Sequence, residues 1–203
     1  MDHYFTNNTN IKSNRRDFYK KIDEIELKFT TDHGVFSYDD IDYGTELLIK
    51  TIFEDENINE YNHAIDLGCG YGPIGLFIKR KFSNLSFKLV DINERAVELT
   101  KHNAKENDIE VEVFRSDFFK LINEENYFNL IVSNPPIRIG KQILFKMYDE
   151  AYNKLTNNGT LWLVVRKQQG ALSHLKFLET VFEDVQVKAR SKGFFIISAR
   201  KII

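Results

Sequence analysis

The feature that most constrains this chain of 203 residues is the alternation of short apolar runs with helix-length amphipathic stretches. Short apolar runs suit buried strands, and hydrophobic residues repeating every 3.6 positions suit helices. The expected strands are His63–Leu67, Phe87–Val90, Ile109–Phe114, Phe128–Ser133, Thr160–Val165, Val185–Ala189 and Phe194–Ala199. The expected helices are Ile74–Lys81, Glu94–Glu106, Lys141–Leu155 and Ala171–Phe182. This rhythm predicts an α/β fold whose mostly parallel sheet carries helices on both faces.

The end of the chain departs from that rhythm. Only the four residues 190–193 separate the last two expected strands, which is too short for a crossover between parallel strands. These strands are therefore expected to pair as an antiparallel hairpin. The sequence predicts a seven-stranded sheet with an antiparallel last strand.

No linker rich in Pro, Ser or Gly divides the chain, and 42% hydrophobic residues are enough for one substantial core. We expect a single domain over residues 1–203, with a core at 61–203 and an N-terminal extension at 1–60. Within the extension, a strand is expected at Glu26–Thr30 and a helix at Glu46–Glu54. The extension is expected to pack on the core, as a structural cap or as a cover for a ligand.

Several classes of protein are disfavoured by composition. No apolar run is long enough to cross a bilayer, and the polar start of the chain lacks a signal-peptide core. The single cysteine, Cys69, excludes an internal disulfide framework and offers no Cys/His cluster for a metal. We therefore expect a cytoplasmic protein without metal or membrane partner; the pattern does not specify an oligomeric state.

The net charge of −2 is distributed unevenly. From residue 161 onward there are eight Lys or Arg against three Asp or Glu. A second basic stretch lies near the N-terminus, at Lys12, Arg15, Arg16, Lys20 and Lys21. Such stretches bind a phosphate backbone in some proteins and are merely solvated surface in others, so both interpretations remain open.

A glycine-rich loop follows the first core strand. Asp66 precedes Gly68, Gly70 and Gly72, and Pro73 stands where a helix would begin. Dinucleotide-binding and methyltransferase folds both use such loops, so the glycines do not choose a cofactor. A carboxylate here would repel a pyrophosphate but attract the ammonium and sulfonium of S-adenosylmethionine, which favours the methyl donor. Within the loop, Cys69 is interpreted as a small filler that contacts the cofactor rather than as a nucleophile.

Two further carboxylates follow the next two strands. Asp91 ends the second strand 21 residues after Gly70, which suits an acceptor for both ribose hydroxyls. Asp117 follows the third strand and suits an acceptor for an adenine amino group, with Ile92 and Phe118 flanking the ring. Each carboxylate taken alone would also suit a helix or turn cap. The ordered set of three favours a cofactor site.

The fourth strand stops at Asn134-Pro135-Pro136-Ile137. Two prolines stiffen this corner and remove two N–H donors, which leaves carbonyl oxygens and the Asn134 amide as its polar groups. Two acceptors, the Asn134 side-chain oxygen and the Pro135 carbonyl, would orient a planar NH2 group toward a methyl donor. Catalysis would consist of positioning and electrostatic stabilisation, with the proton lost afterwards. The pattern therefore predicts an N-methyltransferase.

With these residues in place, the sequence resembles the RsmC-type enzymes, which methylate guanine N2 in small-subunit ribosomal RNA. The resemblance rests on the glycine loop, on Asn-Pro-Pro, and on four longer segments, at residues 34–37, 42–48, 136–141 and 165–171. It implies a Rossmann-like class I methyltransferase fold and S-adenosylmethionine as cofactor. It further implies that Phe36, Gly44 and Thr45 line the donor pocket. By the same resemblance, Asn134, Pro135 and Pro136 hold the guanine amine, with RNA near Arg138, Lys141 and Lys167.

Two departures from that family keep alternatives open. RsmC enzymes carry a second, amino-terminal methyltransferase-like domain. This chain has only the N-terminal extension in that place. Ile137 stands where many amine methyltransferases place an aromatic ring that stacks on the target base. Adenine N6 and protein glutamine present the same NH2 geometry and remain alternative substrates. A non-catalytic RNA-binding or assembly protein is a further alternative, and an NAD-dependent oxidoreductase is the least favoured.

Overall fold

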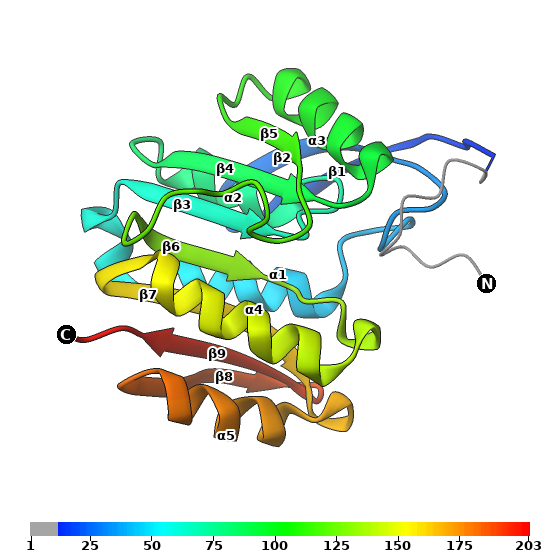
Figure 1. Cartoon of the computed structure of the whole chain (residues 1–203). Coiled ribbons are helices and arrows are strands. Elements are labelled where there is room, and N and C mark those ends of the chain that lie inside the picture. Colours follow the sequence, from blue (N-terminus) through cyan, green and yellow to red (C-terminus); the bar gives the residue numbers. More distant parts are fainter. Residues whose placement is uncertain (1–11) are drawn as a thin grey trace.

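A computed structural model describes residues 12–203; the first eleven residues of the expected extension lie outside the described residues. A seven-stranded sheet with the order β5-β4-β3-β6-β7-β9-β8 forms the centre of the molecule (Figure 1). Its strands are β3 (His63–Leu67), β4 (Ser86–Asp91), β5 (Glu112–Arg115), β6 (Phe128–Ser133), β7 (Leu155–Arg166), β8 (Asp184–Ser191) and β9 (Phe194–Arg200). The first five pair in parallel, and β9 is antiparallel to both β7 and β8. This confirms the predicted fold class, including the antiparallel last strand.

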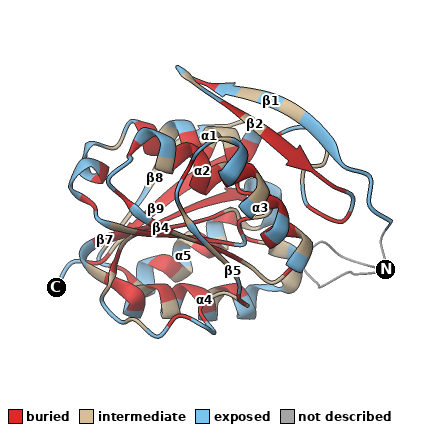
Figure 2. Cartoon of the chain, turned by 90° about the horizontal axis from the view of Figure 1, so that it is seen from above, coloured by how far each residue is buried: buried red, intermediate tan, exposed pale blue. Residues whose placement is uncertain are grey.

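Helices cover both faces of the sheet (Figure 2). One face carries α1 (Tyr43–Phe53), α2 (Pro73–Lys81) and α3 (Glu94–Glu106), and the other carries α4 (Lys141–Lys154) and α5 (Ala171–Val181). Short 3-10 turns occur at η1 (Glu56–Glu60), η2 (Ile137–Ile139) and η3 (Lys167–Gln169). Strands covered on both faces read as continuous apolar runs, which is why β6 and β7 were recognisable from sequence.

A hydrophobic core lies on each side of the sheet. The core beneath α1 to α3 includes Phe29, Leu48, Phe77 and Trp162, and the core beneath α4 and α5 includes Tyr148, among others. Burial of this apolar surface stabilises the sheet and fixes the position of its carboxyl edge, where the parallel strands end. That edge holds the site.

An N-terminal hairpin of β1 (Arg16–Ile22) and β2 (Ile25–Thr31) forms a separate two-stranded sheet outside α2 and α3 (Figure 2). The Asn103 amide on α3 fixes it, accepting from the Thr30 N–H at 2.7 Å and donating to the Thr30 carbonyl at 3.0 Å. The hairpin therefore packs on the core. β1 was not predicted, because charged residues interrupt its apolar alternation.

Three element boundaries differ from expectation by three or more residues, for local reasons. α1 begins at Tyr43, three residues early, because the Asp42 carboxylate caps its first turn. β5 begins only at Glu112, because the Ile109 N–H closes the end of α3 on the Ala104 carbonyl. β7 begins at Leu155, where α4 has already ended. None of these shifts moves the carboxyl edge of the sheet.

Candidate active site

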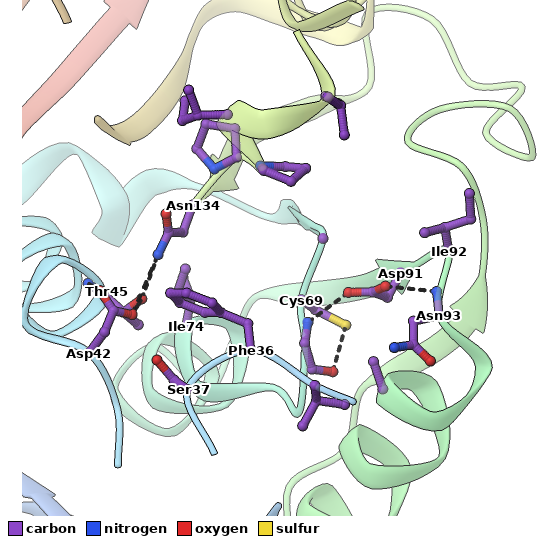
Figure 3. A pocket seen from close by; sticks show the side chains of 18 of the residues that line it. Phe36, Ser37, Asp42, Thr45, Cys69, Ile74, Asp91, Ile92, Asn93 and Asn134 are labelled. Carbon is purple, nitrogen blue, oxygen red and sulfur yellow. Dashed lines mark hydrogen bonds between the residues drawn. The ribbon is translucent and has the colours of Figure 1, made fainter. Parts of the chain in front are cut away.

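A cleft of about 560 Å³ opens at the carboxyl edge of the parallel strands. That volume lies within the range of small-molecule sites, and the place is where α/β folds bind ligands. Among the predicted site residues, those that line the cleft are Phe36, Thr45, Gly68, Cys69, Gly70, Asp91, Ile92, Asp117, Phe118, Asn134, Pro135, Pro136, Ile137 and Arg138. Segments that are far apart in sequence therefore meet around one cavity (Figure 3).

The glycine loop forms one wall of this cleft. Gly68 and Gly70 have φ angles of +72° and +60°, which L side chains rarely adopt, and a Cβ atom on either would meet no atom within 4 Å. Both glycines therefore face open space in the cleft. A larger residue at either position would place its side chain in that space. The loop is anchored behind by the Val90 carbonyl, which accepts from the N–H groups of Gly68 and Cys69. Pro73 opens α2 at its first position, as the sequence predicted.

Asp91 lies at the end of β4 and faces the loop (Figure 3). One carboxylate oxygen accepts from the Gly70 N–H at 2.9 Å and the other from the Asn93 N–H at 2.8 Å. Burial raises the pKa of Asp91 to about 6, although these hydrogen bonds favour the ionised form. Asn93, not Asp91, caps α3, so the capping alternative for Asp91 is excluded. Each carboxylate oxygen retains a lone pair for a ligand hydroxyl.

Asp66 occupies a different position from the one expected. Its side chain is fully buried beneath the loop, where it accepts from the Gly75 N–H at 3.1 Å, and it does not line the cleft. Burial raises its pKa to about 8, so the carboxyl is largely protonated at neutral pH. This burial and the raised pKa do not favour a role for an Asp66 charge in selecting the cofactor. Asp66 supports the loop from below.

The far end of the cleft is formed by the residues after β5. Asp117 lines it and also pairs with Lys120, while Phe118 adopts a left-handed φ of 47°. A non-glycine residue in that region carries backbone strain, and such positions concentrate at functional sites. Ile92 lines the same end. The three residues thus lie together in the lining at this end of the cleft.

The Asn134 corner is held by a chain of side-chain hydrogen bonds (Figure 3). The Asn134 Nδ2 donates to Thr45 Oγ1 at 2.9 Å, and Thr45 Oγ1 donates to the Asp42 carboxylate at 2.5 Å. Because a carboxylate only accepts, it sets the direction of the whole chain. The Asn134 amide is therefore oriented with its nitrogen toward Thr45, which leaves its oxygen as the free acceptor.

Asp42 is among the lining residues that were not predicted. The Asp42 carboxylate both caps α1 and terminates the Asn134 chain. Its capping role was visible in the sequence as an aspartate before a helix, but its contact with position 134 was not. Phe194, Arg166 and Gln169 also line the cleft, at the ends of β9 and β7 and in η3. Arg166 and Gln169 lie in the 165–171 segment of the resemblance, whereas the only signal for Phe194 was its position at the start of a predicted strand.

Four other predicted residues lie outside the lining. Gly72 caps α2 behind the loop, and Gly44 lets the Phe194 ring approach the backbone, since a Cβ there would lie 2.5 Å from it. Lys141 and Lys167 lie beyond the lining, at the starts of α4 and η3. Cys69 is in the lining, and burial raises its pKa well above the usual value, which disfavours a thiolate nucleophile.

Two negative findings apply to residues 12–203. Within that range no His, Cys, Asp and Glu side chains gather in threes as a metal ion would require. None of the helices in that range is both long and apolar enough to pass through a membrane.

Comparisons with known proteins agree with this geometry. Residues 26–198 match the methyltransferase small domain family. The chain is 38% identical to the Bacillus subtilis protein YbxB over 202 residues, 99% of each chain. It is 35% identical to the Haemophilus influenzae ribosomal RNA small subunit methyltransferase C, over 82% of this chain and 49% of that protein. The chain thus spans about half the length of its RsmC relatives.

Solved structures show the same fold. The T. thermophilus 16S rRNA N2 methyltransferase RsmC, in complex with AdoMet and guanosine, superposes with a TM-score of 0.82 at 24% identity, covering 92% of this chain and 50% of that one. A Pyrococcus furiosus methyltransferase superposes with a TM-score of 0.65 at 21% identity, covering 77% and 81%. At these identities, the two likenesses show the fold.

Proposed function

Because the chain belongs to the methyltransferase small domain family and is an S-adenosylmethionine-dependent methyltransferase, we propose that it methylates the exocyclic N2 of a guanine in small-subunit ribosomal RNA. The observation that carries the proposal is the oriented Asn134 amide. Its free oxygen lies at a cleft large enough for a cofactor and a base.

The lining of the cleft fits the cofactor. The open space in front of Gly68 and Gly70 suits close approach of an amino-acid moiety, and Asp91 suits the ribose hydroxyls. Asp117, with Ile92 and Phe118 beside it, suits the adenine ring. When bound, S-adenosylmethionine supplies a methyl group from its sulfonium.

The acceptor end would bind the amine. The Asn134 oxygen and the Pro135 carbonyl accept its two hydrogens and hold the nitrogen in line with the methyl group. Transfer forms an N–C bond, and the S–C electron pair returns to sulfur. The methylated nitrogen then gives up a proton to water. No Lys, His or Glu lines the described cleft, and its three carboxylates, Asp42, Asp91 and Asp117, are engaged by Thr45, by backbone N–H groups and by Lys120. Positioning by Asn134, rather than a general base, is therefore the proposed source of catalysis.

Guanine and ribosomal RNA are supported by the relatives. Several relatives that cover most of this chain at 32–35% identity are named ribosomal RNA small subunit methyltransferase C. The matching half of those proteins corresponds to residues folded here around one sheet, so we propose that residues 1–203 act as a single methyltransferase domain. The proposed partner is RNA, as free ribosomal RNA or within a particle.

The direct test is methyl transfer in vitro. Purified protein and S-adenosylmethionine labelled in the methyl group are incubated with small-subunit ribosomal RNA, with assembly intermediates and with total protein, and each product is digested. N2-methylguanosine is the expected product. Label in N6-methyladenosine or methylated glutamine would overturn the guanine assignment, and no label with any RNA would remove the RNA proposal.

A further inference from the structure

Six exposed cations surround the cleft at the carboxyl edge of the sheet: Arg138, Lys141, Arg166, Lys167, Arg190 and Lys192, here called the edge cations. They come from η2 and the start of α4, from the end of β7 and η3, and from the β8–β9 turn. Figure 1 shows these three segments at the same edge of the sheet. A charged surface thus lies beside the cleft.

Contacts between the segments make this surface continuous. The Lys167 N–H donates to the Gly193 carbonyl at 2.8 Å, which joins η3 to the β8–β9 turn. The Lys141 side chain lies close to Gly170, since a Cβ atom on that glycine would be 3.2 Å from Lys141 Nζ. The start of α4 therefore lies against the start of α5. Arg138 and Arg166 line the cleft itself. The edge cations therefore extend outward from the cleft in one surface.

Three of these cations lie over aromatic rings. The Arg190 guanidinium lies 4.7 Å from the centre of the Phe195 ring. The Arg166 guanidinium lies 4.5 Å from the centre of the Phe194 ring, and Lys192 Nζ lies 4.3 Å from that of Tyr43. The rings themselves are 5.9 Å apart, and the Tyr43 hydroxyl lies 2.7 Å from Ser191 Oγ. Cations that stack on rings in this way keep their charge exposed while losing part of their conformational freedom. They are positioned in advance for an anion.

The edge cations have no carboxylate partner among residues 12–203. The segments that carry them, residues 134–148, 164–178 and 185–203, contain no Asp or Glu. Because no carboxylate neutralises the edge cations, their positive electrostatic potentials add, and the combined potential attracts a polyanion.

The N-terminal basic stretch differs in that two of its five cations are paired with carboxylates. Arg16 pairs with Asp39 at 2.9 Å, and Lys20 pairs with Asp40 at 3.0 Å and with Glu46 at 3.1 Å. The carboxylates that pair with these two cations lie at residues 39–46, so they are missed when charges are counted only within residues 12–21. The hairpin is therefore the weaker candidate for a phosphate surface.

We propose that the edge cations dock the ribose-phosphate backbone of the RNA substrate, with Arg166 and Lys192 holding phosphates next to the nucleotide whose base enters the cleft. The proposal rests on the proposed function and adds the surface and orientation of the RNA. The backbone runs from the start of α4 across η3 to the β8–β9 turn. Phosphate contacts of this kind fix the position of a nucleic acid without reading its sequence.

The test compares two double variants of equal charge change. Arg190→Ala/Lys192→Ala removes edge cations that lie outside the cleft lining, and Arg15→Ala/Lys21→Ala removes exposed cations of the hairpin region. Binding to a small-subunit ribosomal RNA fragment is measured by fluorescence anisotropy over a range of salt concentrations. S-adenosylmethionine affinity, measured by calorimetry, and the thermal midpoint report on the fold.

The edge variant is expected to bind RNA about tenfold more weakly at low salt. The slope of the logarithm of the binding constant against the logarithm of the salt concentration is expected to become shallower by about 2, because two phosphate contacts are lost. The hairpin variant is expected to retain both values, and both variants are expected to keep cofactor affinity. Equal losses in the two variants, or none in the edge variant, would overturn the docking surface while leaving the methyltransferase proposal intact. Absence of RNA binding and RNA methylation by the unaltered protein would overturn both.

Discussion

The two ends of the cleft are built in different ways. At the donor end, the glycine loop and Asp91 belong to neighbouring segments of β3, α2 and β4, and backbone N–H groups supply most of the contacts. At the acceptor end, Asn134 depends on Thr45, which is 89 residues away in sequence. The donor end is thus a local motif, whereas the acceptor end requires the complete fold. Substitutions at the two ends are therefore expected to have separable effects.

The largest expected effect is that of Asn134→Ala on the acceptor end. Loss of a preorganised polar group at a reacting centre typically reduces kcat about 100- to 1,000-fold, whereas S-adenosylmethionine affinity is expected to stay within about twofold. Single-turnover methyl transfer and calorimetry measure the two quantities. Asn157→Ala, an exposed asparagine near the opposite end of β7, is the control. A variant that keeps its rate would remove Asn134 from the mechanism.

Asp91→Ala is expected to affect the donor end. It removes the proposed acceptor for the ribose hydroxyls. Because hydrogen bonds to charged groups contribute roughly 1.5–3 kcal/mol, cofactor affinity is expected to fall about 100-fold. The methyl-transfer rate at saturating cofactor is expected to change far less. The control is Asp149→Ala, which removes an exposed carboxylate of α4 outside the cleft and so makes the same change in charge as Asp91→Ala. An unchanged cofactor affinity would contradict the role of Asp91.

Thr45→Val tests the orientation of the amide with a smaller change. The variant keeps the shape of the buried side chain but removes the hydroxyl that links Asn134 to Asp42. We expect kcat to fall about tenfold, the equivalent of one ordinary hydrogen bond, with cofactor affinity preserved. Thr45→Ser restores the hydroxyl and is expected to restore the rate. If valine and serine behave alike, the hydrogen-bond chain does not orient Asn134.

The smallest expected effect is the pH dependence of the donor end. Burial raises the pKa of Asp91 to about 6, so the ionised fraction falls as the pH drops through that value. Because the ionised carboxylate is the better acceptor, we expect S-adenosylmethionine affinity to decrease about fourfold between pH 7.5 and 5.5. Calorimetry at both pH values measures this. Asp91→Asn has no titrating group there and should lose the dependence; if it does not, another group is responsible.

The contrast between the two ends also explains what the sequence could predict. The sheet, its antiparallel last strand, the glycine loop and Asp91 follow from periodicity and spacing, which are local properties. The resemblance supplied Thr45 as a pocket residue, but neither its bond to Asn134 nor the contact of Asp42 with this chain of hydrogen bonds was visible. Those contacts arise only when residues 42–45 are brought against the end of β6.

Charge was the least predictable property. Asp66 was assigned an electrostatic role from its place before the loop, yet the fold buries it and raises its pKa to about 8. Arg16 and Lys20 looked as basic as the edge cations, but carboxylates from residues 39–46 pair with them. Burial and pairing depend on tertiary contacts, so a count of charges along the chain could not reveal them.

The central claim is most directly tested by mass spectrometry of nucleosides from small-subunit ribosomal RNA. RNA is compared from cells that contain the protein, from cells that lack it, and from cells complemented with the Asn134→Ala variant. We predict that N2-methylguanosine decreases by a defined stoichiometric amount in the second and third samples and is restored only by the unaltered protein. Unchanged N2-methylguanosine in all three samples would contradict the assignment.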